Sequence, residues 1–231
     1  MKVLIIVPAY NEQDAILDVA AELRQYCPEM DFIVIDDCSD DRTRALLREH
    51  QIPYLGLPCN LGIGGCVQTG YQYAAKKGYE IVIQFDGDGQ HDARFLRELI
   101  RPVEEGRADI AVGSRFVEKR GFQSGPVRRV GIAYLSRLLR ALCGLRVRDV
   151  TSGMRAVGTR FVEVYADRYA QDYPEPEALL AAALRGARIV EVPVTMRERK
   201  SGVSSIGPLR SVYYIVKVTL ALILERLEDR A

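Results

Sequence analysis

The first half of the chain repeats one pattern four times: a short apolar run that ends at polar residues, followed by a segment with helical spacing. The apolar runs are Lys2–Val7, Phe32–Ile35, Tyr54–Leu57 and Ile81–Phe85. Continuous apolar runs are typical of parallel strands that helices cover on both faces. The pattern therefore predicts an α/β fold with a mostly parallel sheet, whose ligands bind at the carboxyl ends of the strands.

The later segments extend the same fold. We expect helices at Ala93–Glu105, Val127–Cys143 and Pro208–Glu228, and strands at Asp109–Val112 and Ile189–Val194. Pro193 has no N–H to donate, which places the last strand at an edge of the sheet. The segment Asp149–Arg155 has the composition of a turn. We expect an α/β domain over residues 1–207 and a C-terminal apolar helix over residues 208–231.

The run Ile81–Phe85 leads into two carboxylates one residue apart, Asp86 and Asp88, followed by Gln90 and His91. Two neighbouring carboxylates repel each other unless a cation lies between them. Hard divalent ions take oxygen ligands and often combine one or two carboxylates with the phosphates of a substrate. The sequence thus indicates a metal and diphosphate site, although Asp-Gly-Asp-Gly is also favourable turn chemistry. His91 is expected to be a turn residue or to support the ligands.

Composition argues against several other classes of protein. The 231 residues carry 32 Lys and Arg against 31 Asp and Glu, so no global positive field favours nucleic acid. The five cysteines form no Cys-x-x-Cys pair, which argues against a disulfide framework or a zinc knuckle and favours a reducing cytosol. Gly62-x-Gly64 follows a strand, but Val67 stands where a dinucleotide fingerprint needs its third glycine. Close packing of a helix on a strand is the alternative role of these glycines.

Seven separated motifs resemble one family. Pro8-Ala9-Tyr10-Asn11-Glu12, Ile35-Asp36-Asp37-x-Ser39, Asn60-Leu61-Gly62-x-Gly64 and Asp86-Gly87-Asp88-Gly89-Gln90-His91 resemble the inverting family-two glycosyltransferases of the GT-A fold. Gly113-Ser114-Arg115, Asp149-x-Thr151-Ser152-Gly153-x-Arg155 and Ser201-Gly202-x-Ser204-Ser205 resemble the polyprenyl-phosphate, dolichol-phosphate mannose synthase-like branch. The motifs cover nearly the whole chain. The resemblance implies a GT-A, Rossmann-like fold and a metal-dependent hexosyltransferase.

For the sugar donor, the resemblance implies three groups of residues. Pro8, Tyr10, Glu12, Asp37, Asn60 and Gly64 would hold the nucleotide sugar. Asp86, Asp88 and Gln90 would bind Mg²⁺ or Mn²⁺ together with the diphosphate, and the ion would neutralise the charge on the leaving nucleoside diphosphate. Arg199, Lys200 and Ser204 would close over the diphosphate as a loop, and a surface loop without a role is the alternative.

For the acceptor, the resemblance implies that Arg115, Arg128 and Arg129 bind a lipid phosphate. Guanidinium groups bind phosphate bidentately, and an acceptor phosphate is ionised near pH 7, so it needs no base. Asp149 would organise the acceptor pocket together with Arg155, or the two would form an internal ion pair. Asp88, Arg115 and Asp149 are the residues that we expect to be catalytic. Arg137 and Arg140 are expected on a solvated helix face or near anionic lipid headgroups.

The expected reaction moves a UDP-linked hexose or N-acetylhexosamine onto a polyprenyl (undecaprenyl) phosphate for cell-surface glycan synthesis. One alternative is transfer to a sugar hydroxyl of a polysaccharide. That reaction needs a general base, for which Asp149, Glu175 and Glu177 are the candidates. The other alternative is a nucleotide-sugar-binding protein without catalytic activity.

The C-terminal helix predicts contact with a second surface. Its apolar stretch Val212–Leu224 rises only about 20 Å as a helix, against roughly 30 Å of hydrocarbon, so it is too short to span a bilayer. A near-heptad stripe is expected to pack, and the remaining positions are apolar too. The stripe comprises Leu209, Val212, Tyr213, Val216, Leu220, Ile223 and Leu227. We expect a peripheral protein at the inner face of the cell membrane, in contact with the bilayer, a small membrane protein or a second copy of the chain.

Overall fold

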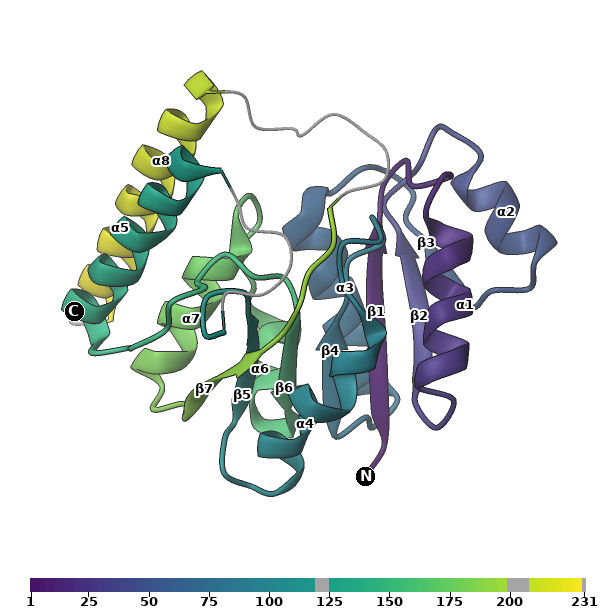
Figure 1. Ribbon diagram of the computed structural model, residues 1–231, viewed down its shortest axis with the longest axis horizontal. Helices are drawn as coiled ribbons and strands as arrows, with labels where there is room; N and C mark the ends of the chain where they lie inside the picture. Colours follow the sequence, from purple (N-terminus) through teal and green to yellow (C-terminus); the bar gives the residue numbers. More distant parts are fainter. Residues whose placement is uncertain (119–124, 199–207, 230–231) are drawn as a thin grey trace.

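The computed structural model describes residues 1–118, 125–198 and 208–229, and it consists of a central sheet with helices on both faces (Figure 1). The seven strands lie in the order β3-β2-β1-β4-β6-β5-β7. They are β1 (Val3–Ala9), β2 (Asp31–Asp36), β3 (Tyr54–Gly56), β4 (Ile81–Gln84), β5 (Ile110–Ser114), β6 (Arg155–Gly158) and β7 (Ile189–Pro193). Only β6 runs antiparallel to its neighbours among these strands. The predicted α/β fold with a mostly parallel sheet is confirmed.

The helices connect the strands and cover the sheet. They are α1 (Ile16–Tyr26), α2 (Thr43–Glu49), α3 (Gly62–Lys76), the 3₁₀ turn η1 (Ala93–Phe95), α4 (Leu96–Glu104), α5 (Pro126–Cys143), α6 (Thr159–Asp167), α7 (Pro174–Leu184) and α8 (Pro208–Glu228). Figure 1 shows α5 and α8 side by side at one end of the molecule and α1 and α2 at the other.

Strand β1 is buried on both faces, as its apolar sequence predicts. Its side chains alternate between two apolar clusters, because successive residues of a strand point to opposite faces. Leu4 and Ile6 belong to the cluster that includes residues of α3, α5, α6, α7 and α8. Ile5 and Val7 belong to the cluster that includes residues of α1, α2 and α4. Each face of the sheet is therefore sealed, and its carboxyl edge is the place where polar side chains can gather.

Two features of the sheet differ from the sequence prediction. Strand β1 includes Pro8 and Ala9, because its pairing with β2 continues to the register Ala9 opposite Asp36. Strand β6 begins at Arg155, the last residue of the segment predicted as a turn, and helix α6 follows the strand; Arg155 lies opposite Gln84 of β4. The remaining expectation for the sheet holds, since β7 is an edge strand.

Helix α8 packs against α5 and α7 through the face that we did not expect to pack. Val218 and Leu222 are fully buried, and Ile215 lies so close to Gly131 of α5 that an added Cβ there would be 2.9 Å from its Cδ1. The predicted packing stripe instead points outward. The exposed members of the stripe are Tyr213, Val216, Leu220, Ile223 and Leu227, and Leu224 is exposed as well. The side chains of Leu209 and Val212 lie outside the described residues. Both faces are apolar, so the choice depends on α5 and α7 rather than on periodicity.

None of the described helices is both long enough and apolar enough to cross a bilayer.

Candidate active site

The polar segments that follow β2, β1 and β4 meet at the carboxyl edge of the sheet. Strand β1 lies between the other two, and its last residues accept hydrogen bonds from both sides. The N–H of Asp37 donates to the carbonyl of Ala9 at 2.9 Å, and the N–H of Gly87 donates to the carbonyl of Pro8 at 3.2 Å. The acidic segments that the sequence places about 50 residues apart are thus joined across one strand.

The two acids after β2 have different environments. Asp36 is fully buried and pairs with Arg44, whose Nε lies 2.7 Å from the carboxylate. The carboxylate of Asp37 accepts the N–H of Leu61 at 2.7 Å, at the start of α3. Burial raises the pKa of Asp37, while the hydrogen bonds from Leu61 and Gly62 lower it in part. Asp36 is therefore a structural carboxylate, and Asp37 has the position predicted for a nucleoside ligand.

The loop after β1 is locked onto the loop after β2 by Asn11, a residue that our sequence reasoning did not select. Asn11 has a φ of 58°, in the left-handed region that asparagine tolerates. Its side-chain oxygen accepts the N–H groups of Asp40 and Asp41, at 3.0 and 3.4 Å. The N–H of Glu12 donates to Thr43 at 2.9 Å. Glu12 is thus fixed beside the loop that carries Asp37. Tyr10, in the same loop as Glu12, is exposed.

Gly64 and Asn60 lie at the beginning of α3. The N–H of Gly64 donates to the carbonyl of Gln171 at 2.9 Å, and a Cβ at Gly64 would lie 2.1 Å from the carbonyl oxygen of Ala170. This contact accounts for the glycine by close packing against the segment between α6 and α7, whereas the alternative expected from the sequence was packing of a helix on a strand. The side chain of Asn60 accepts the N–H of Gly62 at 3.1 Å and closes the turn that begins the helix.

The loop after β4 carries Asp86, Asp88 and Gln90. Asp88 accepts the N–H of Gln90 at 3.0 Å, and the carbonyl of Gln90 accepts the N–H of Arg197 at 2.8 Å. Arg197 also binds Glu22 of α1 through two hydrogen bonds of 2.6 and 2.8 Å. It forms an ion pair with the buried Asp92 at 3.0 Å. The loop is therefore fixed at its far end by a residue that lies just after β7.

The oxygen atoms of this loop fit a divalent cation that shares its ligands with a substrate. The side chain of Asp86 is 34% exposed, and Asp88 and Gln90 are partly exposed. Within the described residues no three His, Cys, Asp or Glu side chains gather closely enough to enclose an ion. Two carboxylates and an amide oxygen suit Mg²⁺ or Mn²⁺, because such ions usually keep positions for phosphates and water.

Arg115 and Asp149 form a buried ion pair. Arg115 Nε and Nη2 each donate to one carboxylate oxygen at 2.7 Å, and the Arg115 N–H donates to Asp149 at 3.1 Å. Asp149 is fully buried, and Arg115 is only 6% exposed. The main partner of Asp149 is therefore Arg115 and not Arg155, which was the ion-pair alternative from the sequence. Arg155 instead donates to the carbonyls of Ser152 and Val150, at 2.8 and 3.2 Å.

The predicted phosphate ligands Arg128 and Arg129 lie at the start of α5. Neighbouring groups that partly exclude water and the like charge of Arg115 lower the pKa of Arg128, although its side chain is exposed at the surface. Arg129 is exposed. The structure thus brings Arg128 near the Arg115–Asp149 pair, which concentrates positive charge at one place. Arg199, Lys200 and Ser204 lie outside the described residues.

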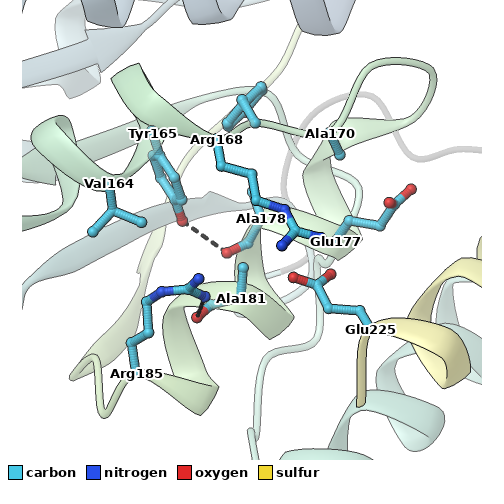
Figure 2. Close-up of a pocket in the computed structure, with 10 residues that line it drawn as sticks. Val164, Tyr165, Arg168, Ala170, Glu177, Ala178, Ala181, Arg185 and Glu225 are labelled. Carbon is cyan, nitrogen blue, oxygen red and sulfur yellow. Dashed lines mark hydrogen bonds between the residues drawn. The ribbon is translucent and has the colours of Figure 1, made fainter. Parts of the chain in front are cut away.

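The three candidate bases are separated by the fold. Asp149 is occupied by Arg115, as described above. Glu177 faces a cavity between α6, α7 and α8, together with Glu225 and two arginines (Figure 2). Glu175 lies at the start of α7, where Arg155, Asp86 and Arg128 influence its charge, and burial raises its pKa. Of the three, Glu175 is therefore the one that the fold brings toward the acidic loop.

Two further residues next to Asp86 escaped the sequence analysis. Gln84 is fully buried, and its Nε2 lies 3.4 Å from Asp86 Oδ1. Gly153 approaches so closely that an added Cβ would lie 2.7 Å from Asp86 Oδ2. The polar Gln84 at the end of an apolar run was a usable signal, whereas the approach of Gly153 depends on the unpredicted strand β6.

Comparison with known proteins gives one family. The family model described as "Glycosyl transferase family 2" matches residues 4–163. The polyprenol monophosphomannose synthase of Mycolicibacterium smegmatis is 30% identical, over 89% of this chain and 81% of the relative. The undecaprenyl-phosphate mannosyltransferase of Micrococcus luteus is 31% identical, over 90% of this chain and 88% of the relative.

A solved structure supports the fold. The glucosyl-3-phosphoglycerate synthase of Mycobacterium tuberculosis, in complex with Mn²⁺ and UDP-glucose, superposes with a TM-score of 0.75. The match covers 97% of this chain and 78% of that one, at 20% identity. The predicted GT-A, Rossmann-like fold is thus confirmed, and at this identity the likeness concerns the fold alone.

Proposed function

The chain belongs to glycosyl transferase family 2, and from this premise we propose that it transfers a hexose from a nucleotide diphosphate sugar to a polyprenyl phosphate, with inversion at the anomeric carbon. The observation that carries the proposal is the similarity, over about nine tenths of the chain, to two enzymes named for mannosyl transfer to polyprenol or undecaprenyl phosphate. The buried Arg115, with the exposed Arg128 near it, supports an acceptor with an anionic head.

On the donor side, Glu12 and Asp37 hold the nucleoside. Carboxylates accept hydrogen bonds from ribose hydroxyls or a base N–H, and both residues are fixed by backbone contacts between loops. Asp86, Asp88 and Gln90 are the residues that would hold Mg²⁺ or Mn²⁺. Such an ion, when bound, would neutralise the charge that develops on the departing nucleoside diphosphate.

On the acceptor side, Arg128 and Arg129 bind the lipid phosphate, and Arg115 adds positive charge from beneath. A phosphate oxygen attacks the anomeric carbon of the sugar, the bond to the nucleoside diphosphate breaks, and the electron pair leaves with that group. The phosphate is ionised near neutral pH, so the step needs no general base. Asp149 then acts by holding Arg115 in place rather than by moving a proton.

A second function is favoured by the position of Glu175. Its carboxyl group lies near Asp86 and has a raised pKa, as a general base for a hydroxyl acceptor would need. Transfer to a sugar hydroxyl of a polysaccharide is therefore the second candidate. The Glu175→Gln variant separates the two, because only hydroxyl transfer loses a proton-accepting group.

The reaction also implies a place at the inner face of the cell membrane, where the lipid acceptor resides. Helix α5, which packs beside α8, also exposes apolar side chains, since Val130 is 72% and Tyr134 41% exposed. Arg137 and Arg140 are exposed on α5 as well. Apolar side chains beside arginines suit the interface of an anionic bilayer. A small membrane protein or a second copy of the chain is the alternative occupant.

Vesicle flotation tests this location. Leu220→Glu combined with Leu224→Glu should abolish binding to anionic vesicles, whereas Tyr26→Glu, at an exposed aromatic of α1, should not. If wild type ignores vesicles and runs as a dimer that the double variant dissociates, a second copy covers the stripe.

The transfer itself is tested with radiolabelled UDP-sugars and GDP-sugars, undecaprenyl phosphate, and Mn²⁺ or Mg²⁺. Label should pass into the organic phase with wild type and not with Asp88→Ala. Donor binding without any transfer to lipid or to glycan acceptors would favour a nucleotide-sugar-binding protein without catalytic activity. Label that enters only a glycan product, and only with Glu175 intact, would favour the second candidate.

A further inference from the structure

Asp86 has an unusually complete set of neighbours for a partly exposed carboxylate. His91 contacts it twice: the backbone N–H of Asp86 donates to His91 Nδ1 at 3.0 Å, and His91 Nε2 lies 3.5 Å from Asp86 Oδ2. Gln84 Nε2 lies 3.4 Å from the other carboxylate oxygen. Side chains from β4 and from the loop after it therefore lie beside both oxygens of the Asp86 carboxylate.

The backbone contact fixes the state of the imidazole. A backbone N–H can only donate, so Nδ1 of His91 must accept and carries no proton. In the neutral ring the proton then resides on Nε2, which faces the Asp86 carboxylate. The ring is 3% exposed and packs edge-on against Phe85, with 5.3 Å between the ring centroids. It has little freedom to turn away.

The opposite side of the carboxylate is also closed. A Cβ added at Gly153 would lie 2.7 and 2.9 Å from the two Asp86 carboxylate oxygens, so only glycine leaves the carboxylate in this position. Together His91, Gln84 and Gly153 leave Asp86 one orientation. A metal ligand held in this way loses less freedom when the ion binds.

We propose that His91 is a positioning residue that orients the Asp86 carboxylate for the divalent cation, through its Nδ1 contact to the backbone and its Nε2 contact to the carboxylate. The inference rests on the proposed role of Asp86 as a metal ligand. The geometry distinguishes it from a histidine that only fills the core, because both ring nitrogens are directed at one residue.

The two contacts can be removed separately. The amide oxygen of His91→Asn can reach the place of Nδ1 but not of Nε2, and the amide nitrogen of His91→Gln can reach the place of Nε2 but not of Nδ1. His91→Phe keeps the packing on Phe85 and removes both. Mn²⁺ affinity with saturating UDP, measured from the free Mn²⁺ signal by electron paramagnetic resonance, should fall about tenfold in the Phe variant. The Asn and Gln variants should lie between Phe and wild type.

Two measurements separate positioning from folding. UDP binding in EDTA, measured by calorimetry, should stay within about twofold of wild type in all three variants, because the nucleoside residues lie in the loops after β1 and β2. The only other histidine of the chain, the exposed His50, gives the matched control His50→Phe, which should leave Mn²⁺ affinity unchanged.

The outcomes are distinct. If wild type binds Mn²⁺, Asp88→Ala does not, and His91→Phe binds as wild type does, the positioning role is wrong while the proposed metal site stands. If His91→Phe loses UDP and Mn²⁺ binding to the same degree, the residue is structural and the inference also fails. If Asp88→Ala binds Mn²⁺ as well as wild type, the proposed metal site and the inference fall together.

Discussion

The donor side and the acceptor side of the site are built differently. On the donor side, formed by the loops after β1, β2 and β4, backbone N–H groups and short polar side chains join neighbouring loops, as with Asp37 and Leu61. On the acceptor side, formed by β5, the segment before β6 and the start of α5, one buried ion pair between Arg115 and Asp149 is the central contact. A network of small contacts tolerates the loss of one member, whereas a buried pair does not. Mutations on the two sides should therefore have different signatures.

The largest effect on stability is expected from Asp149→Asn. This change leaves the Arg115 guanidinium buried without its counter-charge, which costs about 3–5 kcal/mol of unfolding free energy when a buried pair is broken. Urea unfolding followed by circular dichroism measures the loss. The double variant Arg115→Met with Asp149→Leu is the control, because it removes both charges and should recover most of the stability. An Asn variant as stable as wild type would show that the pair is not the central contact of the acceptor side.

Asp88→Ala should show the opposite signature. Its carboxylate is partly exposed on the donor-side loop, so unfolding free energy should change by less than about 1 kcal/mol. Transfer should fall by about 10²–10³-fold, because a group that stabilises the leaving diphosphate is lost. Initial rates at saturating Mn²⁺ and thermal unfolding of the same preparation provide the two readouts. A large loss of stability with normal transfer would contradict the expected difference between the donor side and the acceptor side.

The donor side could be predicted from the sequence because it depends on the order of strands and their ends. Apolar runs that end in Asp37 or Asp86 place acids at the carboxyl edge of a parallel sheet, whatever the details of packing. The contacts that hold those acids were less accessible. Gly153 reaches Asp86 only because β6, four residues long, inserts antiparallel beside β4.

The acceptor side was less predictable because several residues of the same type could have formed each of its contacts. From the sequence we considered only Arg155 as an ion-pair partner of Asp149. The fold shows that Arg115 binds Asp149, while Arg155 donates to backbone carbonyls. The same limit applies to α8, where both faces are apolar and the neighbouring helices decide which one is buried. Sequence periodicity identifies such elements but not their partners.

Arg197→Ala sharpens the comparison, since it removes two ion pairs on the donor side. Arg197 joins Glu22 and Asp92 and supports the loop of Gln90 through its backbone. The arginine is 35% exposed, so solvent weakens these pairs, and we expect a loss of about 1–2 kcal/mol. The backbone contact to Gln90 remains in the variant, so Mn²⁺ affinity should fall less than threefold. Arg24→Ala on α1 is the control, because its guanidinium makes two weak contacts, one of 3.5 Å to the carbonyl of Gln51 and one of 5.8 Å to the ring centroid of Phe32. A collapse of Mn²⁺ binding would mean that the side chain, not the backbone, holds the loop.

The smallest effect concerns Glu177, in the cavity between α6, α7 and α8 (Figure 2). Burial, followed by the charge of Glu225 and then of Asp172, raises the pKa of Glu177 to about 7, and Lys217 opposes the shift. The folded protein therefore holds a proton that the unfolded chain releases near pH 4.5, so stability should fall as pH rises from about 4.5 to 7. Glu177→Gln removes this slope and should stabilise the protein at pH 8 by about 1 kcal/mol, a value reduced for solvent screening. Thermal unfolding at pH 5 and pH 8 measures the difference. We expect the variant to gain stability and to keep its transfer activity. A loss of transfer would instead show that this cavity, together with the Arg115–Asp149 pair, supports the acceptor side.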